Sequence, residues 1–266
     1  MAEPLIEARS IVKVFAGSSA GRRSAQVRLL DQVDLTIEQG SSVGLIGESG
    51  SGRTTLARIL AGLVQPDEGS VAWLGRDISG LKGAEWKEYR CAIQYVFPDP
   101  LTSMNPRQTV RVVLATPMRA LTGRDRKARA LFTEEVLDRV GLSSEILDWH
   151  PRQLSGGQLR QVALARALAA GPDLLILDEP MSALDVSAQV RQLTMLTRIR
   201  QDLGVAYLLI SDNLPVVERL CDQVAVLKAG RVVEQGSSEQ VLNRPSDAYT
   251  RQLCAAVPGL PVDSNS

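Results

Sequence analysis

The stretch Leu154-Ser155-Gly156-Gly157-Gln158 decides the fold of this chain, because a second motif starts 20 residues after it does. That second motif, Leu174-Leu175-Ile176-Leu177-Asp178-Glu179, is an apolar strand that ends on two adjacent carboxylates. A third stretch lies upstream, Gly47-Glu48-Ser49-Gly50-Ser51-Gly52-Arg53-Thr54, and has the glycine spacing of a loop that surrounds phosphate. Three such signals in this order rarely arise by chance, so we interpret them together.

The glycine-rich loop has a direct physical purpose. Gly47, Gly50 and Gly52 let backbone N–H groups turn inward around phosphate oxygens, and the helix predicted after the loop adds its positive N-terminal end. Read alone, the loop is also compatible with an ordinary Gly/Ser-rich turn, because it lacks the usual lysine. The motif at Leu174–Glu179 favours the phosphate-binding interpretation.

Three side chains in these motifs suit the chemistry of a magnesium nucleotide. Thr54 offers a hydroxyl to Mg²⁺, and Asp178 at the end of its strand is placed to hold the same ion through water. Glu179, beside it, is placed to polarise an attacking water. The motifs therefore predict a site for ATP and Mg²⁺.

The Leu154–Gln158 stretch has two readings. Ser155 and the N–H groups of Gly156 and Gly157 lie just ahead of a predicted helix and form an anion site there. The simpler reading is that Ser155 only caps that helix, an interaction worth about 1 kcal/mol. The sequence leaves both readings open at this point.

Periodicity along the chain favours an α/β fold, because short apolar strands alternate with helical patterns. Strands are predicted over Leu5–Val14, Val33–Ile37, Val43–Ile46, Leu174–Leu177, Val205–Ile210 and Gln223–Leu227. Helices are predicted over Thr54–Leu63, Asp125–Val140, Ser155–Ala170 and Ala188–Leu203. The first two strands are expected to pair antiparallel, with a polar turn at Gly17–Arg23 between them, and the others to form a parallel-rich core.

The domain organisation follows from where strands are missing. No convincing strand occurs between about Pro98 and Ala170, so this segment is predicted to be a helical lobe inserted into the core. The predicted divisions are an antiparallel β part with the glycine loop at 1–97, the helical subdomain at 98–170 and the rest of the core at 171–236. A short helix and a frayed tail, Val257–Ser266, complete the expected segment 237–266.

Composition narrows the class of protein. The 266 residues are 44% hydrophobic and 23% charged, which suits a well-packed globular protein, and 30 basic residues balance 30 acidic ones. This balance predicts no global attraction to nucleic acid or to an anionic bilayer. Three scattered cysteines favour reduced thiols and a cytoplasmic location. The sequence has no apolar run long enough for a membrane span, and Met1–Pro4 does not resemble a secretory leader, so any membrane role is expected to come through a partner.

Together, the three motifs resemble those of the nucleotide-binding subunits of ABC transporters, from about Leu5 to Pro258. The resemblance implies a P-loop NTPase fold with a RecA-like core, an antiparallel β subdomain and an inserted helical subdomain. It also implies ATP hydrolysis in a head-to-tail dimer, in which each site takes its P-loop from one subunit and its Leu-Ser-Gly-Gly-Gln motif from the other.

The resemblance assigns roles residue by residue. The nucleotide would be bound by Gly47, Glu48, Ser49, Gly50, Ser51, Gly52, Arg53, Thr54 and Thr55. Phe15 occupies the place where family members stack adenine. Ser155, Gly156, Gly157 and Gln158 would face the γ-phosphate held by the opposite subunit. Asp185, in Ser182-Ala183-Leu184-Asp185, belongs to the stretch that resembles the D-loop at the dimer interface, although alone it would be an ordinary turn or cap.

Three departures from the family pattern concern the same phosphate. Arg53 replaces the P-loop lysine, and its planar, longer guanidinium cannot occupy the same compact position. Pro98 replaces the Q-loop glutamine and has no side-chain donor or acceptor. Asp212 replaces the switch histidine, and a carboxylate repels a γ-phosphate where the histidine would donate to it. From these three departures we expect an impaired ATP site in this subunit. Glu179 and the Leu154–Gln158 stretch, the signature motif of the family, are retained. We therefore expect this subunit to give an intact signature motif to a different partner, in a heterodimer. The single histidine, His150, is expected to have no catalytic role.

Two further stretches resemble the dipeptide, oligopeptide and nickel uptake group. They are Phe97–Val110 and the tail Arg244–Pro258. The resemblance implies peptide uptake first, with nickel or a nickel chelate as the alternative cargo. It implies a second ABC ATPase subunit and two polytopic permease subunits as partners, an extracytoplasmic binding protein as an indirect one, and a peripheral position on the cytoplasmic face of the membrane.

Hypotheses of other classes are a soluble ABC-type ATPase in DNA repair or translation, and a nucleotide-binding module without turnover. The chain has no zinc-ligand insertions, no long coiled-coil arms and no clear basic patch, so we expect no nucleic-acid partner. Translation factors of this type usually carry two such cassettes in one chain. The binding-module reading agrees with an impaired site in this subunit.

Overall fold

A computed structural model describes residues 4–16, 26–123, 125–182 and 184–257 of the chain. The chain divides into two compact units, residues 1–81 with 208–266 and residues 82–207, and each is described by itself. The predicted turn at Gly17–Arg23 lies outside the described residues, as does the expected tail beyond Val257. The predicted subdomain boundaries at residues 97, 170 and 236 stay a prediction.

The first unit begins with an antiparallel sheet of strand order β2-β1-β4-β5. Strand β1 (Ile6–Ala16) pairs antiparallel with β2 (Gln26–Ile37), as predicted, and also with β4 (Glu68–Trp73). The short β5 (Arg76–Asp77) completes the sheet. The sequence pattern does not predict β4 and β5, because their run of alternation is short and lies between turns.

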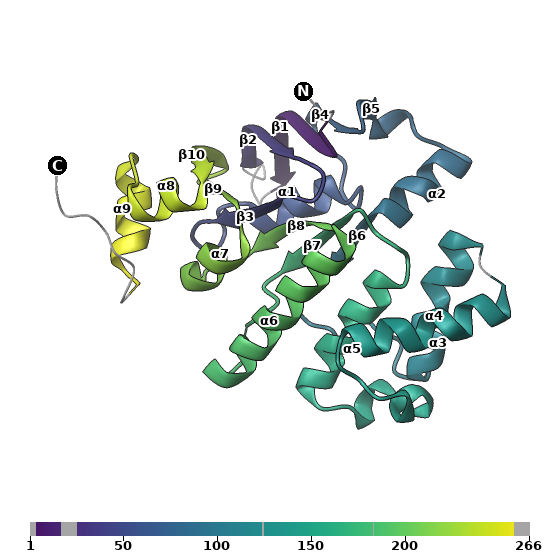
Figure 1. Cartoon of the computed structure of the whole chain (residues 1–266). Helices are drawn as coiled ribbons and strands as arrows, with labels where there is room; N and C mark the ends of the chain where they lie inside the picture. Colours follow the sequence, from purple (N-terminus) through teal and green to yellow (C-terminus); the bar gives the residue numbers. More distant parts are fainter. Residues whose placement is uncertain (1–3, 17–25, 124, 183, 258–266) are drawn as a thin grey trace, which may run out of the picture. The chain divides into compact units, whose positions relative to one another are not determined.

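The same unit contains strands in the order β10-β9-β3-β8 (Figure 1). Strand β3 (Ser42–Ile46) is buried at every residue and pairs parallel with β9 (Gln223–Lys228). Strand β8 (Ala206–Ile210) enters this unit at Leu208, and β10 (Arg231–Ser237) pairs antiparallel with β9. Strands β3 and β8 are buried along their whole length, which explains their continuous apolar sequence, a pattern typical of parallel sheets.

The helices of the first unit are α1 (Arg53–Leu60), α7 (Leu214–Leu220), α8 (Ser238–Asn243) and α9 (Ala248–Ala255). A Cβ atom at Gly44 of β3 would lie 2.5 Å from Val217 Cγ1 of α7, so this glycine allows the helix to pack closely on the strand. Two helices follow Gly236, where the sequence predicts one. Asp247 caps the second of them by accepting hydrogen bonds from the N–H groups of Tyr249 and Thr250.

The second unit pairs β6 (Ile93–Val96) parallel with β7 (Leu174–Asp178). Its α-helices are α2 (Gly83–Ala92), α3 (Val110–Pro117), α4 (Arg126–Arg139), α5 (Gly156–Leu168) and α6 (Val186–Leu203). Within the described part of residues 98–170 the structure has helices and no strand, and α3, α4 and α5 lie there in the teal part of Figure 1. This observation agrees with the helical character expected for the segment.

Local capping explains where the predicted helices begin and end. Helix α6 starts two residues earlier than predicted, because the Asp185 carboxylate accepts the Ala188 N–H at 2.8 Å. It ends at Leu203, as predicted, and the next residue, Gly204, has φ 64°. Helix α1 ends at Leu60 instead of the predicted Leu63. Gly62, two residues later, adopts a left-handed φ of 67°, which is incompatible with continuing the helix.

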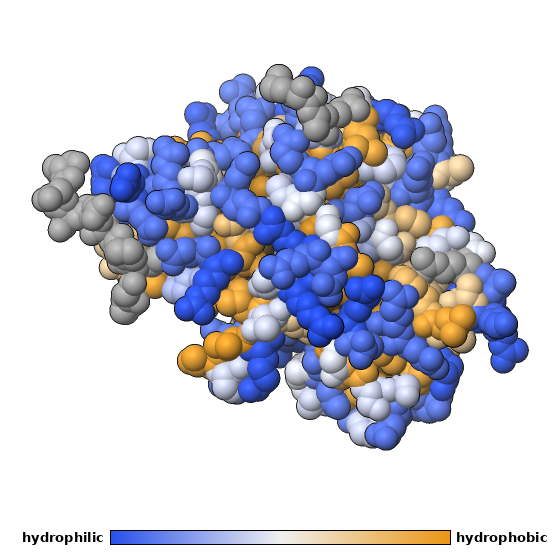
Figure 2. Space-filling model, viewed as in Figure 1, coloured by the Kyte–Doolittle hydropathy of each residue, from blue (hydrophilic) through white to orange (hydrophobic). Residues whose placement is uncertain are grey.

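Hydrophobic side chains are concentrated in the interiors of both units. On the face seen in Figure 2, orange side chains reach the surface in small patches separated by hydrophilic ones. Within the described residues, none of the helices combines the length and apolar character needed to cross a bilayer.

The structure contains helices, an antiparallel sheet and parallel strand pairs, so the α/β fold class predicted from the sequence is confirmed.

Candidate functional site

In the first unit, the glycine-rich loop between β3 and α1 has a conformation that requires glycine. Gly47 has φ 146°, and a Cβ atom there would lie 2.1 Å from the Leu227 carbonyl oxygen. Gly52 has φ 108°, and its Cβ would lie 2.7 Å from Leu30 Cδ2. At Gly50, with φ 82°, an added Cβ would meet no atom within 4 Å. The loop is therefore tightly packed at both ends and open in the middle.

The helix after the loop offers its N-terminal end. Gly52 is the N-cap of α1 and no side chain caps this helix. The helix has no acidic residue in its first turn, which contains Arg53, Thr54 and Thr55. Helix N-termini with this composition favour anions, because the first N–H groups point along the axis with the positive end of the helix dipole. Together with the open middle of the loop, this end forms a concave site suited to phosphate.

Arg53 connects the loop to the segment that contains Asp212. Its Nη1 atom donates to the Ser211 carbonyl oxygen at 3.2 Å, and Asp212 follows with an exposed side chain. Asn213 then caps α7 by accepting the Val216 N–H at 3.3 Å. The structure thus brings two of the three positions that depart from the family pattern into neighbouring places.

Phe15 lies on β1 of the same unit with 44% of its side-chain surface exposed. The ammonium group of Lys13 lies 5.6 Å from the centre of its ring. An exposed aromatic ring is available to a flat ligand, and its adenine-stacking role stays a prediction.

In the second unit, Asp178 and Glu179 lie at the end of β7. Asp178 is only 1% exposed, and its Oδ2 atom accepts a hydrogen bond from the Tyr95 hydroxyl at 2.6 Å. Glu179 has φ 50°, a left-handed conformation that costs on the order of 1–3 kcal/mol in a residue with a side chain. Backbone strain of this kind is concentrated at functional sites, where the surrounding structure maintains it.

Tyr95 is a residue that sequence reasoning missed. It lies on β6, opposite Ile176 in the parallel pair with β7, and from there its hydroxyl reaches the Asp178 carboxylate. The sequence pattern predicts no strand at Ile93–Val96, and a lone tyrosine there gives no signal of this contact. Pro98 follows β6 with an exposed ring and has no side-chain hydrogen-bonding group.

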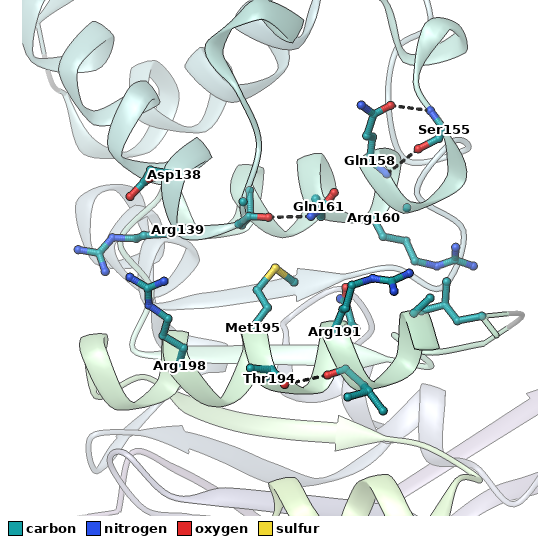
Figure 3. Close-up of a pocket in the computed structure, with 17 residues that line it drawn as sticks. Asp138, Arg139, Ser155, Gln158, Arg160, Gln161, Arg191, Thr194, Met195 and Arg198 are labelled. Carbon is teal, nitrogen blue, oxygen red and sulfur yellow. Dashed lines mark hydrogen bonds between the residues drawn. The ribbon is translucent and has the colours of Figure 1, made fainter. Parts of the chain in front are cut away.

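The Leu154–Gln158 stretch forms a reciprocal cap on α5. Ser155 Oγ accepts the Gln158 N–H at 3.2 Å, and Gln158 Oε1 accepts the Ser155 N–H at 2.9 Å, as Figure 3 shows. The capping reading of Ser155 is therefore confirmed. It does not exclude the anion reading, because a Cβ at Gly157 would meet no atom within 4 Å and the backbone there is exposed.

A cavity of about 580 Å³ lies in the second unit next to this cap, between the ends of α4 and α5 and the side of α6. Figure 3 shows Met195 directed from α6 toward its middle and several arginines around it. These arginines have partners: Arg139 pairs with Glu135 at 2.8 Å, Arg198 pairs with Asp202 at 3.5 Å, and Arg160 donates to the Ser182 carbonyl oxygen at 2.8 Å. The Arg160 contact connects α5 to the segment that leads to Asp185.

Comparison with known proteins decides the family. The family model described as "ABC transporter" matches residues 30–182. The chain belongs to the ABC transporter family. It is 43% identical to the nickel import ATP-binding protein NikE of Rhodospirillum rubrum over 96% of the chain and 93% of that protein. It is 39% identical to the oligopeptide transport ATP-binding protein OppF of Lactococcus lactis, over 91% of the chain and 76% of that protein.

Solved structures of ABC cassettes have the same fold. The dimeric cassette MJ0796, bound to ADP and Pi in a post-hydrolysis state, superposes with a TM-score of 0.76. The match is 25% identical and covers 88% of this chain and 98% of that chain. The family and the uptake group predicted from the motifs are confirmed.

ABC ATPase domains bind ATP, for which Mg²⁺ is the typical counter-ion. Among residues 4–16, 26–123, 125–182 and 184–257, the structure has no cluster of three or more His, Cys, Asp or Glu side chains that could hold a metal ion. Mg²⁺ commonly takes only one or two protein ligands and fills its shell with water and phosphate oxygens.

Proposed function

We propose that this chain is the ATP-binding subunit of a membrane importer for peptides, acting at the cytoplasmic face with a second ABC ATPase subunit and two permease subunits. The observation that carries the proposal is the match to importer ATP-binding proteins over more than nine-tenths of the chain, with the glycine loop, Asp178, Glu179 and the Ser155 cap all present. An extracytoplasmic binding protein would select the cargo.

In this proposal the residues divide the work of ATP binding. The backbone N–H groups of the loop and the uncapped end of α1 bind the phosphates, and Phe15 stacks on the adenine. Thr54 and Asp178 would hold Mg²⁺, which neutralises charge on the β- and γ-phosphates when bound. Glu179 would orient the attacking water, and Asp185 would contribute to the dimer interface.

We further propose that the site built on this subunit's own loop hydrolyses ATP poorly. The Arg53 guanidinium reaches the Ser211 carbonyl oxygen at 3.2 Å, whereas a lysine would present a compact ammonium to the phosphates. Asp212 places an exposed carboxylate beside that contact, and Pro98 offers no ligand. The intact Ser155–Gln158 motif would complete the site of the partner ATPase, which makes a heterodimer the productive assembly.

Nickel, or a nickel chelate, is the second candidate cargo. The nickel import protein NikE is 43% identical to this chain, whereas the oligopeptide protein OppF is 39% identical. The residues that bind ATP do not discriminate between these cargoes, because the ATP-binding subunit does not contact cargo. A soluble ABC ATPase or a binding module without turnover is the remaining alternative.

Co-purification tests the proposal. The tagged chain, expressed in its own host cells, is expected to purify from detergent-solubilised membranes with two polytopic proteins and a second ATPase. Reconstituted in lipid with its binding protein, the complex should show ATPase stimulated by short peptides. Stimulation by Ni²⁺ alone would favour the second cargo, and recovery of a lone soluble ATPase would contradict the importer.

A further inference from the structure

The C-terminal part of the first unit holds the start of the nucleotide loop in place. The Leu227 carbonyl oxygen of β9 occupies the space beside Gly47, where a Cβ atom would approach it to 2.1 Å. The Gly230 N–H, in the turn between β9 and β10, donates to the Ser51 carbonyl oxygen at 3.0 Å. Both contacts restrict the backbone of the loop at Gly47 and Ser51.

Tyr249 of α9 adds a third contact, which comes from 201 positions further along the chain. The backbone N–H of Glu48 donates to the Tyr249 hydroxyl oxygen at 2.9 Å. The Glu48 carbonyl oxygen accepts the Ser51 N–H at 3.1 Å, so both polar groups of this peptide segment are engaged. Tyr249 is 5% exposed, and burial raises the pKa of its hydroxyl, which keeps the phenol neutral.

Neighbouring residues hold Tyr249 in place. The Lys228 ammonium lies 4.6 Å from the centre of the tyrosine ring. Asp247 caps α9 and accepts the Tyr249 N–H at 2.8 Å. Glu234 of β10 accepts the Ser246 N–H at 2.8 Å and the Asp247 N–H at 3.1 Å, which attaches the start of α9 to the sheet.

We propose that Tyr249 is a positioning residue for the nucleotide loop, whose hydroxyl fixes the Glu48 peptide so that the following N–H groups are already arranged for phosphate. The inference rests on the proposed binding of ATP by this loop. A loop that is held before binding loses less conformational freedom when the phosphates bind, so the affinity is higher. The two C-terminal helices thus contribute to nucleotide binding without contacting the ligand.

Two single-atom variants of the full chain separate positioning from general stability. Tyr249→Phe removes the hydroxyl and keeps the ring beside Lys228. Tyr207→Phe is the matched control, because its buried hydroxyl donates to the Leu196 carbonyl oxygen at 2.9 Å, a hydrogen bond that involves no residue of the loop. Three quantities are measured: amide hydrogen exchange in the peptide covering residues 47–51, the dissociation constants of Mg·ATP and adenosine, and the melting temperature.

For Tyr249→Phe we expect faster exchange in residues 47–51 and Mg·ATP binding weaker by about three- to ten-fold, with adenosine affinity unchanged. Tyr207→Phe should lower the melting temperature at least as much and leave the exchange of the loop and the ATP affinity at parent values. Equal loss of ATP affinity in both variants, or parent-like loop exchange in Tyr249→Phe, would overturn the inference. If the parent binds no nucleotide, the proposed function fails, and loop exchange alone decides whether Tyr249 holds the loop.

Discussion

Single residues set the chemistry of the proposed ATP site, and three of them depart from the family pattern. Arg53 keeps the positive charge of a lysine but extends toward Ser211, and Asp212 follows with an exposed carboxylate. Glu179 keeps its carboxylate and has a strained φ of 50°, so the chain retains the group proposed to orient water while three other positions depart from the family pattern. A retained glutamate beside the three substitutions in the sequence pattern predicts that this chain binds ATP but hydrolyses it inefficiently.

Restoring the three positions should restore turnover. The variant Arg53→Lys, Pro98→Gln, Asp212→His is expected to raise ATP hydrolysis at this site by about tenfold or more, because it returns the donors to the γ-phosphate while keeping Glu179. Arg53→Lys alone should give a smaller gain. Phosphate release is measured in the assembled complex, with the partner's own site inactivated. No gain in a folded, assembled triple variant would show that these substitutions do not limit the site.

At the scale of elements, side-chain caps fix where helices begin, and one carboxylate attaches a helix to a strand. Asp185 begins α6, the Ser155–Gln158 pair begins α5, and Glu234 of β10 holds the start of α9 through the N–H groups of Ser246 and Asp247. Burial raises the pKa of the Glu234 carboxyl, but these hydrogen bonds outweigh burial and hold the pKa below its usual value. The attachment of α9 therefore depends on an ionised carboxylate.

This dependence predicts an acid-sensitive contribution to stability. Because the pKa of Glu234 is lower in the folded state, its contribution is fully present above the unfolded value of about 4.3 and is lost as the pH falls through the folded value. Glu234→Gln should lower the free energy of unfolding at pH 7, and its difference from the parent should shrink below about pH 4. Urea denaturation of Glu234→Gln and the parent at pH 7 and below about pH 4 measures this difference in the free energy of unfolding. A difference that does not change with pH would mean that the charge of Glu234 is unimportant.

A second prediction at this scale concerns Gly157, at the start of helix α5. Gly157 has open space where a side chain would begin, so Gly157→Asp should fold while adding volume and negative charge where the partner's γ-phosphate is proposed to lie. We expect substrate-stimulated ATPase of the whole complex to fall by about 100-fold or more, as when an essential anion contact is lost. Glu179→Gln in this chain should cost much less than the same change in the partner. An active Gly157→Asp complex would mean that this motif does not face a working site.

At the scale of the whole molecule, one cassette of this composition is expected to work only as part of an assembly. In the proposed arrangement two subunits together form two ATP sites, so a homodimer of this chain would have two sites of the proposed impaired kind. Steady-state phosphate release from the isolated chain should therefore be well below about 1 s⁻¹, the lower end of ordinary turnover. Addition of the partner ATPase and permeases should raise it. Turnover at or above about 1 s⁻¹ by the pure chain would contradict the impaired-site proposal.

Local sequence patterns determine much of this protein by themselves. The glycines of the loop, the Ser155 cap and the apolar run that ends at Asp178 act within a few residues, so their meaning is visible in the sequence. The contacts that tune the site join distant positions: Arg53 to Ser211, Tyr95 to Asp178 and Glu48 to Tyr249 are 158, 83 and 201 residues apart. These pairs depend on which strands are neighbours and where α9 packs, so only the tertiary structure decides them. A hydrogen bond between distant residues requires its two atoms to be placed to within a few tenths of an ångström, and no short-range pattern encodes that.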